Sequence, residues 1–215
     1  MIKRYLLTFL AFSLLVIGYL LTLLPLQTVR SDLATGTYIK ALLIWGVLVA
    51  LSFVPAVSMT IKKIWVFPGS GEPVPEKDLR AVLLAINTMN VPIRVTEKRK
   101  RMLVGWRYDD PQWCERMVAA GLSRIYELRL KFNAKTRTVT VVDRYRRVNF
   151  DLCPVRVKTG ILALPRPLFL LKKDKGISTY RQMNPADFHF KPTEIKAPLT
   201  ATILAHGWNV QFALF

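Results

Sequence analysis

The sequence has few of the residues from which most catalytic centres and metal sites are built. Its 215 residues include two cysteines and two histidines. It contains no His-Glu-x-x-His, Cys-x-x-Cys, phosphate-binding glycine loop or Gly-x-Ser-x-Gly turn. Two cysteines are too few for a small secreted disulfide scaffold. We therefore expect no cofactor and no metal, and the sequence points only weakly toward an enzyme.

Charge is missing from two long stretches. Residues 5–24 and 41–60 each run for 20 positions without a charged side chain. At 1.5 Å per residue, each helix would be roughly 30 Å long, the thickness of a bilayer core. We predict a transmembrane helical hairpin over residues 1–64. The first stretch is longer than a signal-peptide core and no small-x-small site follows it, which disfavours cleavage.

Neither predicted span contains an acidic, basic or histidine residue. Ion pathways and proton relays normally need such groups at depth, so the spans are expected to anchor rather than transport. Basic residues flank the outer ends of the hairpin at Lys3, Arg4, Lys62 and Lys63. The connecting loop has Arg30, offset by Asp32, with Lys40 at its boundary. The positive-inside rule then predicts an integral protein of a bacterial-type inner membrane, with its N-terminus and C-terminal domain in the cytoplasm.

The remainder of the chain is strongly basic. Residues 65–215 hold 26 basic and 13 acidic residues, a net charge of +13. Residues 65–75 are rich in proline and glycine and are predicted to form a linker. Trp65 and Phe67, next to two lysines, are predicted to be anchors at the membrane interface. Residues 76–215 are then a basic cytoplasmic domain.

The pattern of this domain predicts an α+β fold whose sheet is mostly antiparallel, with helices on one face. Helices are expected from Glu76, from Asp110-Pro111 to Gly121, and over 193–205, where Pro198 would force a kink or a later start. Strands are expected at 93–97, 102–108, 124–132, 137–145, 155–164, 168–171 and 208–214.

Two basic runs are candidate binding sites. The first, at the tip of a predicted hairpin, is Lys98, Arg99, Lys100 and Arg101, and the second is Arg144, Arg146 and Arg147. Cations near an anionic bilayer each contribute roughly 1 kcal/mol of attraction. The tip could instead contact RNA or an acidic protein, or be a solvated turn that blocks edge pairing. No RNA-binding motif accompanies either run.

The remaining candidates have simple structural explanations. Asp109 and Asp110 lie between Trp106 and Trp113, at a strand-to-helix junction where one carboxylate would cap the helix. His206 is placed at a helix end. Cys114 and Cys153 are expected to be reduced on the cytoplasmic side, although a Cys114–His206 nucleophile pair stays open.

These observations predict a membrane-anchored accessory or scaffold protein whose basic domain binds a protein partner and the anionic membrane surface. The first alternative is a membrane-bound enzyme acting on a lipid or membrane-associated substrate, with its site near 106–113 or at His206. A membrane-tethered nucleic-acid binder is the second alternative.

Overall fold

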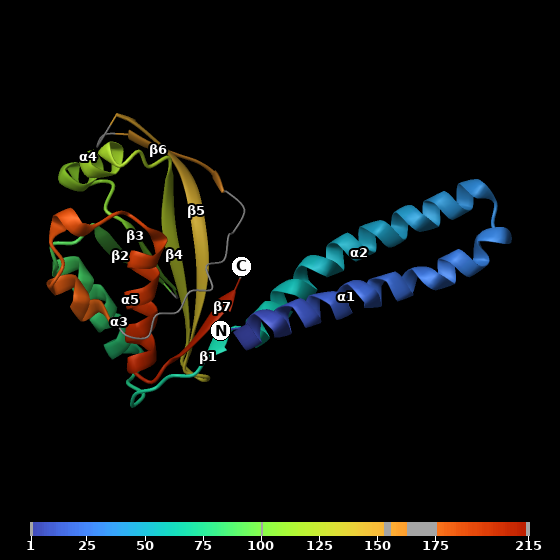
Figure 1. The fold of residues 1–215 in the computed structure, drawn as a ribbon, viewed down its shortest axis with the longest axis horizontal. Helices are drawn as coiled ribbons and strands as arrows, with labels where there is room; N and C mark the ends of the chain where they lie inside the picture. Colours follow the sequence, from blue (N-terminus) through green and yellow to red (C-terminus); the bar gives the residue numbers. More distant parts are fainter. Residues whose placement is uncertain (1, 100, 153–155, 163–175, 214–215) are drawn as a thin grey trace. The chain divides into compact units, whose positions relative to one another are not determined.

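A computed structural model describes residues 2–99, 101–152, 156–162 and 176–213 (Figure 1). The chain divides into two compact units, Met1–Trp65 and Val66–Phe215. The first unit is helical and the second contains the sheet.

The first unit is a pair of long helices, α1 (Ile2–Thr28) and α2 (Thr35–Ile64), joined by a short 3-10 turn (Val29–Ser31). Both helices are long and apolar enough to cross a membrane. Among the described residues, every exposed large apolar side chain lies within 2–59, except Val118. This distribution suits contact with lipid rather than with water.

Polar side chains join the two helices at three levels. Tyr19 donates a hydrogen bond to Ser52 (2.8 Å), and the indole of Trp45 donates to Thr22 (3.1 Å). The indole of Trp65 donates to Thr8 at 3.0 Å. Such interhelical bonds contribute about 0.6–2 kcal/mol each within a bilayer. They hold the hairpin together where apolar packing alone gives little preference over lipid.

The second unit alternates strands and helices. Its strands are β1 (Val66–Phe67), β2 (Ile93–Lys98), β3 (Arg101–Trp106), β4 (Arg124–Asn133), β5 (Thr138–Leu152), β6 (Arg156–Leu162) and β7 (Asn209–Ala213). Its α-helices are α3 (Glu76–Leu84), α4 (Pro111–Ala119) and α5 (Pro192–Ala205). Short 3-10 turns cover Ala85–Thr88, Ile177–Arg181 and Pro185–Asp187.

The described strands form one sheet in the order β1-β7-β5-β4-β3-β2, and β6 pairs with β5. Every pairing is antiparallel except that of β5 with β7. The expected α+β fold with a mostly antiparallel sheet is confirmed. Alternation places Leu128, Phe132 and Asp143 on one face, which we call the inner face.

Helices α3 and α5 cover the inner face (Figure 1). Arg80 of α3 lies 4.3 Å from the ring centre of Phe132, and Lys196 of α5 reaches Asp143. Residues Ile195–Leu204 of α5 are all buried, so this helix runs through the core. Pro198 lies inside α5, which begins at Pro192 and is assigned as one continuous helix.

Two further predictions concern helix and strand ends. The Asp110 carboxylate accepts a hydrogen bond from the Gln112 amide (3.1 Å) with Pro111 in the first turn, which confirms the predicted cap of α4. The expected strand at 155–164 corresponds to β6. The expected strand at 168–171 lies outside the described residues.

The segment expected to be a linker is bonded into the domain. Val66 and Phe67 pair with Gln211 and Val210, and the amides of Ser70 and Gly71 donate to the Leu204 carbonyl. A Cβ at position 71 would lie 1.7 Å from the Ala205 oxygen, so only glycine fits there. Trp65 alone therefore separates α2 from the first strand of the sheet.

Candidate functional site

Sheet register brings cations from three strands into one row. Lys98 of β2 pairs with Arg101 of β3, and Arg101 pairs in turn with Lys131 of β4. All three side chains are exposed and point to the face opposite the inner face, which we call the outer face. Adjacent members of the row are roughly 5 Å apart. The predicted tip thus continues onto a third strand.

The turn between β4 and β5 adds further cations at the same end of the sheet. Lys131 lies two residues before the end of β4, and the exposed Lys135 and Arg137 follow in the turn. We call this set the basic end: Lys98, Arg99, Arg101, Lys131, Lys135 and Arg137. The sequence analysis had identified only the part from the first hairpin; Lys100 belongs to that predicted run and lies outside the described residues.

The basic end is arranged at some expense of stability. Like charges directly opposite on neighbouring strands repel, and here three cations follow one another. Arg99 and Arg137 have φ of 48° and 46°, the left-handed region where glycine or asparagine is the unstrained residue. Backbone strain of this kind recurs at functional sites, so the basic end is a candidate binding surface.

A groove on the outer face adjoins the row. It has a volume of about 270 Å³ and includes Lys98, Leu103, Gly105 and Glu127 in its lining. Because Gly105 has no side chain, the surface between β2 and β4 is hollow at that point. A Cβ there would meet only ordinary contacts, the nearest being Glu127 Cγ at 3.6 Å. The lining of the groove therefore combines charges of both signs with the apolar side chain of Leu103.

The second predicted basic run lies toward the other end of the sheet. Arg144, Arg146 and Arg147 pair with Glu127, Ile125 and Arg124 of β4. Arg147 is seven residues beyond Thr140, the partner of Lys131. At about 3.3 Å per residue this is roughly 23 Å along the strand. The structure therefore does not gather the two predicted runs into one site.

The two predicted interface anchors have different surroundings. Trp65 packs edge-on against Tyr5 at 5.0 Å between ring centres, and its indole bonds to Thr8. Phe67 belongs to β1, packs against Phe212 at 5.4 Å, and is 7% exposed. Phe67 is therefore a core residue of the domain, and Trp65 is itself 0% exposed, so neither predicted anchor presents a free aromatic face.

The carboxylates and histidines that were considered for an enzyme have structural partners. Asp109 forms an ion pair with Arg94, and Asp110 caps α4. The His206 ring nitrogen Nδ1 lies 2.8 Å from the Thr202 carbonyl at the end of α5. Trp106 and Trp113 are buried against Phe190 and Phe188. None of these contacts assembles a nucleophile with a base.

Cys114 corrects the expectation of reduced thiols. The residue is fully buried in α4 and is disulfide-bonded. Sulfur held in a disulfide has no thiolate to act as a nucleophile, which removes the Cys114–His206 pair. The only other cysteine of the sequence is Cys153, which lies outside the described residues.

A buried charged cluster was missed by the sequence analysis. Lys196 of α5 lies 2.6 Å from Asp143 of β5, and the two side chains are 2% and 3% exposed. Tyr126 donates to Asp143 at 2.5 Å. Desolvation lowers the pKa of Lys196 despite the opposing effect of Asp143, and desolvation together with Asp143 raises the pKa of Tyr126. Lacking solvent access, the cluster joins helix to sheet rather than serving a substrate.

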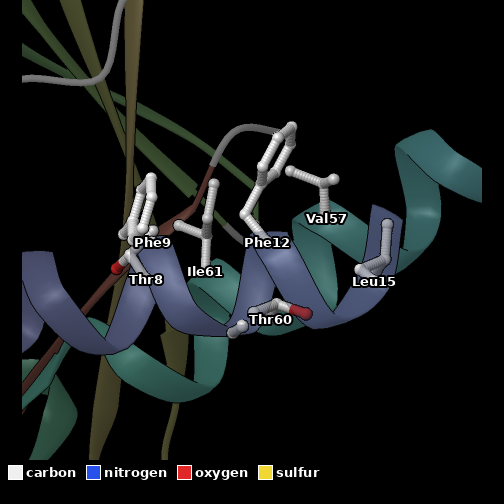
Figure 2. Close-up of a pocket in the computed structure, with 8 residues that line it drawn as sticks. Thr8, Phe9, Phe12, Leu15, Val57, Thr60 and Ile61 are labelled. Carbon is white, nitrogen blue, oxygen red and sulfur yellow. The ribbon is translucent and has the colours of Figure 1, made fainter. Parts of the chain in front are cut away.

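The hairpin has one groove between its helices, shown in Figure 2, with a volume of about 230 Å³. Phe9, Phe12 and Ile61 contribute most of its apolar wall. Its two threonine hydroxyls are engaged within the hairpin, since Thr8 donates to the Arg4 carbonyl and Thr60 to that of Ala56. The groove offers hydrocarbon contact and no group for chemistry, consistent with an anchor.

Within the described residues, no three histidine, cysteine, aspartate or glutamate side chains cluster as metal ligands. The chain matches no protein-family model, no curated protein and no solved structure. The site is therefore interpreted from its own geometry and charge.

Proposed function

We propose that this chain is a membrane-anchored accessory protein whose domain holds its basic end against anionic lipid and binds a protein partner. The observation that carries the proposal is the convergence of two basic hairpin ends beside the point where the domain is attached. The two apolar helices are proposed to anchor the protein.

The attachment supports contact with the same membrane. β1 follows α2 after a single residue, Trp65. Within the domain, Val66 pairs with Gln211, which pairs with Thr140, two residues from the start of β5. Counted at about 4.8 Å per strand, the basic end extends from roughly 10 to 24 Å across the sheet from β1. Its cations would each contribute about 1 kcal/mol near anionic headgroups.

The protein partner is proposed to dock on the outer-face groove. Arg94 and Lys98 line one part of it, while Asp109 and Glu127 supply opposite charge. Arg94 and Asp109 are paired with each other, and a groove lined largely by polar and charged side chains suits a polypeptide segment better than an acyl chain. No contact in the described residues favours the enzyme alternative. The second basic run encloses one aromatic residue, Tyr145, but its ring packs against the buried Tyr126 at 5.3 Å between ring centres, whereas single-stranded nucleic-acid sites present such rings to bases.

The lipid part is tested with the full chain in nanodiscs of neutral or anionic lipid. Hydrogen exchange at residues 99–101 and 134–137 should be slower in the anionic bilayer, and added salt should remove the difference. Replacing the cations at positions 98, 101 and 131 with serine should also remove the difference in exchange between the two bilayers. The matched control is serine at 144, 146 and 147, which removes the same charge and should change nothing. Equal exchange in both bilayers would refute lipid contact.

The partner part is tested by purifying the protein in mild detergent at native expression. A stoichiometric protein that survives a high-salt wash, and is lost from Gly105→Val, is the expected result. Gly18→Val is the control, because Gly18 lies in the hairpin and a Cβ there meets nothing within 4 Å. If only lipid or nucleic acid is recovered with the protein, and salt releases it, the proposal of a protein partner is refuted.

The proposal holds on either face of the membrane. The flanking charges predict the cytoplasmic face, and the disulfide of Cys114 opposes that prediction.

A further inference from the structure

From the disulfide bond of Cys114 we infer that the domain lies on the oxidising side of the membrane, with the hairpin loop near residues 29–34 on the reducing side. The inference reverses the orientation predicted from charge. It goes beyond the proposed function, because the basic end and the groove are the same on either side.

The chemistry of the bond requires an electron acceptor. Two thiols lose two protons and two electrons when one sulfur–sulfur bond forms, and an oxidised disulfide carrier is reduced to its dithiol in exchange. Periplasm, secretory lumen and cell exterior supply such carriers. The cytosol instead maintains reduced glutathione and thioredoxin, so structural disulfides there are rare.

The position of Cys114 makes the bond structural. Cys114 is 0% exposed in α4, where it follows the buried Trp113 and lies three residues before the buried Met117. An attacking thiolate must reach a sulfur atom for exchange, and a fully buried sulfur gives it no access. The Cys114 sulfur is therefore shielded from exchange, and the bond records the compartment in which the domain folded.

The opposing observation is the charge of the hairpin flanks. Lys3, Arg4, Lys62 and Lys63 lie on the domain side, against Arg30 and Lys40 near the loop. This difference is two residues, and the charge rule is a bias rather than a prohibition. Glutathione and thioredoxin in the cytosol would continually reduce such a bond. The disulfide is therefore stronger evidence for the orientation than the charge difference.

Topology is measured on the full chain in intact cells with a permeable outer envelope. One form carries an epitope after Phe215 and another carries it between Ser31 and Asp32. Added protease should remove the first epitope and leave the second, which serves as the internal control. Removal of the loop epitope alone would overturn the inference.

Thiol trapping provides the second measurement. Cells are quenched in acid, and the denatured chain is treated with a maleimide polymer before and after reduction. We expect no adduct before reduction and two adducts after it, whereas Cys114→Ser should give one adduct without reduction. Two adducts before reduction would overturn the inference, as would oxidised cysteines in a chain whose C-terminal epitope is protected.

Discussion

The side chain of Asn87 pairs with the backbone of Val95 as if it were a neighbouring strand. Its amide nitrogen donates to the Val95 carbonyl and its oxygen accepts from the Val95 amide, both at 2.8 Å. β2 is an end strand of the described sheet, so these backbone groups would otherwise be open to another chain. The guanidinium of Arg107 similarly donates to the Ile93 carbonyl at 2.9 Å. Side chains thus close this edge.

Asn87→Ala should lower the free energy of unfolding by about 1–3 kcal/mol, because two backbone groups lose their partners. It should also promote association through β2. Chemical denaturation and cross-linking of the detergent-solubilised chain measure the two effects. Thr88→Val is the control, since the Thr88 hydroxyl bonds only to the Ala85 carbonyl in its own turn. A variant that behaves like this control would contradict the assignment.

Removing one partner of the buried ion pair should lower the free energy of unfolding more than removing both partners. Asp143→Leu or Lys196→Met alone leaves a charge in the core and should cost about 3–5 kcal/mol. The double variant should cost clearly less than the sum of the two. Tyr126→Phe, which removes one hydrogen bond to Asp143, should cost about 1 kcal/mol. Denaturant titrations decide this, and strict additivity would count against a coupled pair.

The domain should lose stability above pH 10. Burial raises the pKa of Tyr126 and of Tyr180 well above 10.0, with Asp143 and Glu194 respectively adding to the effect. The unfolded chain releases these protons near pH 10 while the native state retains them. The free energy of unfolding then falls by about 1.4 kcal/mol per pH unit for each tyrosine, up to its folded pKa.

Lys196 acts in the opposite direction over a lower range. Its folded pKa is lowered, so the unfolded chain holds that proton longer and stability rises with pH up to 10.5. Above that value only the two tyrosines contribute, and the net change is a loss. Tyrosinate absorbance and circular dichroism should change together in an alkaline titration. Ionisation of all tyrosines well before unfolding would contradict the prediction.

Arg99→Gly should separate stability from binding. Glycine relieves the left-handed strain and removes one cation from the basic end, so the variant should be about 1 kcal/mol more stable yet protect its tip less on anionic lipid. Thermal unfolding and hydrogen exchange measure the two effects. Arg101→Ser is the comparison, because it removes a cation without changing the turn. Reduced stability of Arg99→Gly would refute the strain argument.

Reduction should destabilise the domain. Loss of a native disulfide from a small domain typically costs about 2–5 kcal/mol. The reduced wild type and Cys114→Ser should share one lowered denaturation midpoint. Equal midpoints for oxidised and reduced chains would mean that the bond adds nothing to stability.

Local patterns predicted much of the fold. Asp110-Pro111 identified the start of α4, and the alternation of Tyr126, Leu128 and Leu130 identified β4, because caps and pleats depend on neighbouring residues. The two long apolar runs similarly identified the helices of the hairpin.

Long-range pairing was not predictable from the same patterns. Lys131 joins Lys98 and Arg101 only because β3 pairs with β4, which no local signal specifies. Asp143 and Lys196 are 53 residues apart in sequence. A signal did exist, since each is a charge at an inward position of an apolar segment. Gly69 and Gly71 fall in the predicted linker, whereas the structure shows that they permit close approach to the chain near Gly207 and Ala205.

The position of β7 sets a condition on biosynthesis. This strand lies between β1, which follows the hairpin directly, and β5. The ribosome therefore synthesises the two apolar helices and the segments of β2 to β5 before the strand that joins β1 to them exists. Until residues 209–213 emerge, β1 lacks its partner and the β5 segment 138–142 is open on one side. A chain that stops before residue 209 would stay attached to the membrane with an unclosed sheet, which makes the final strand a natural checkpoint for quality control.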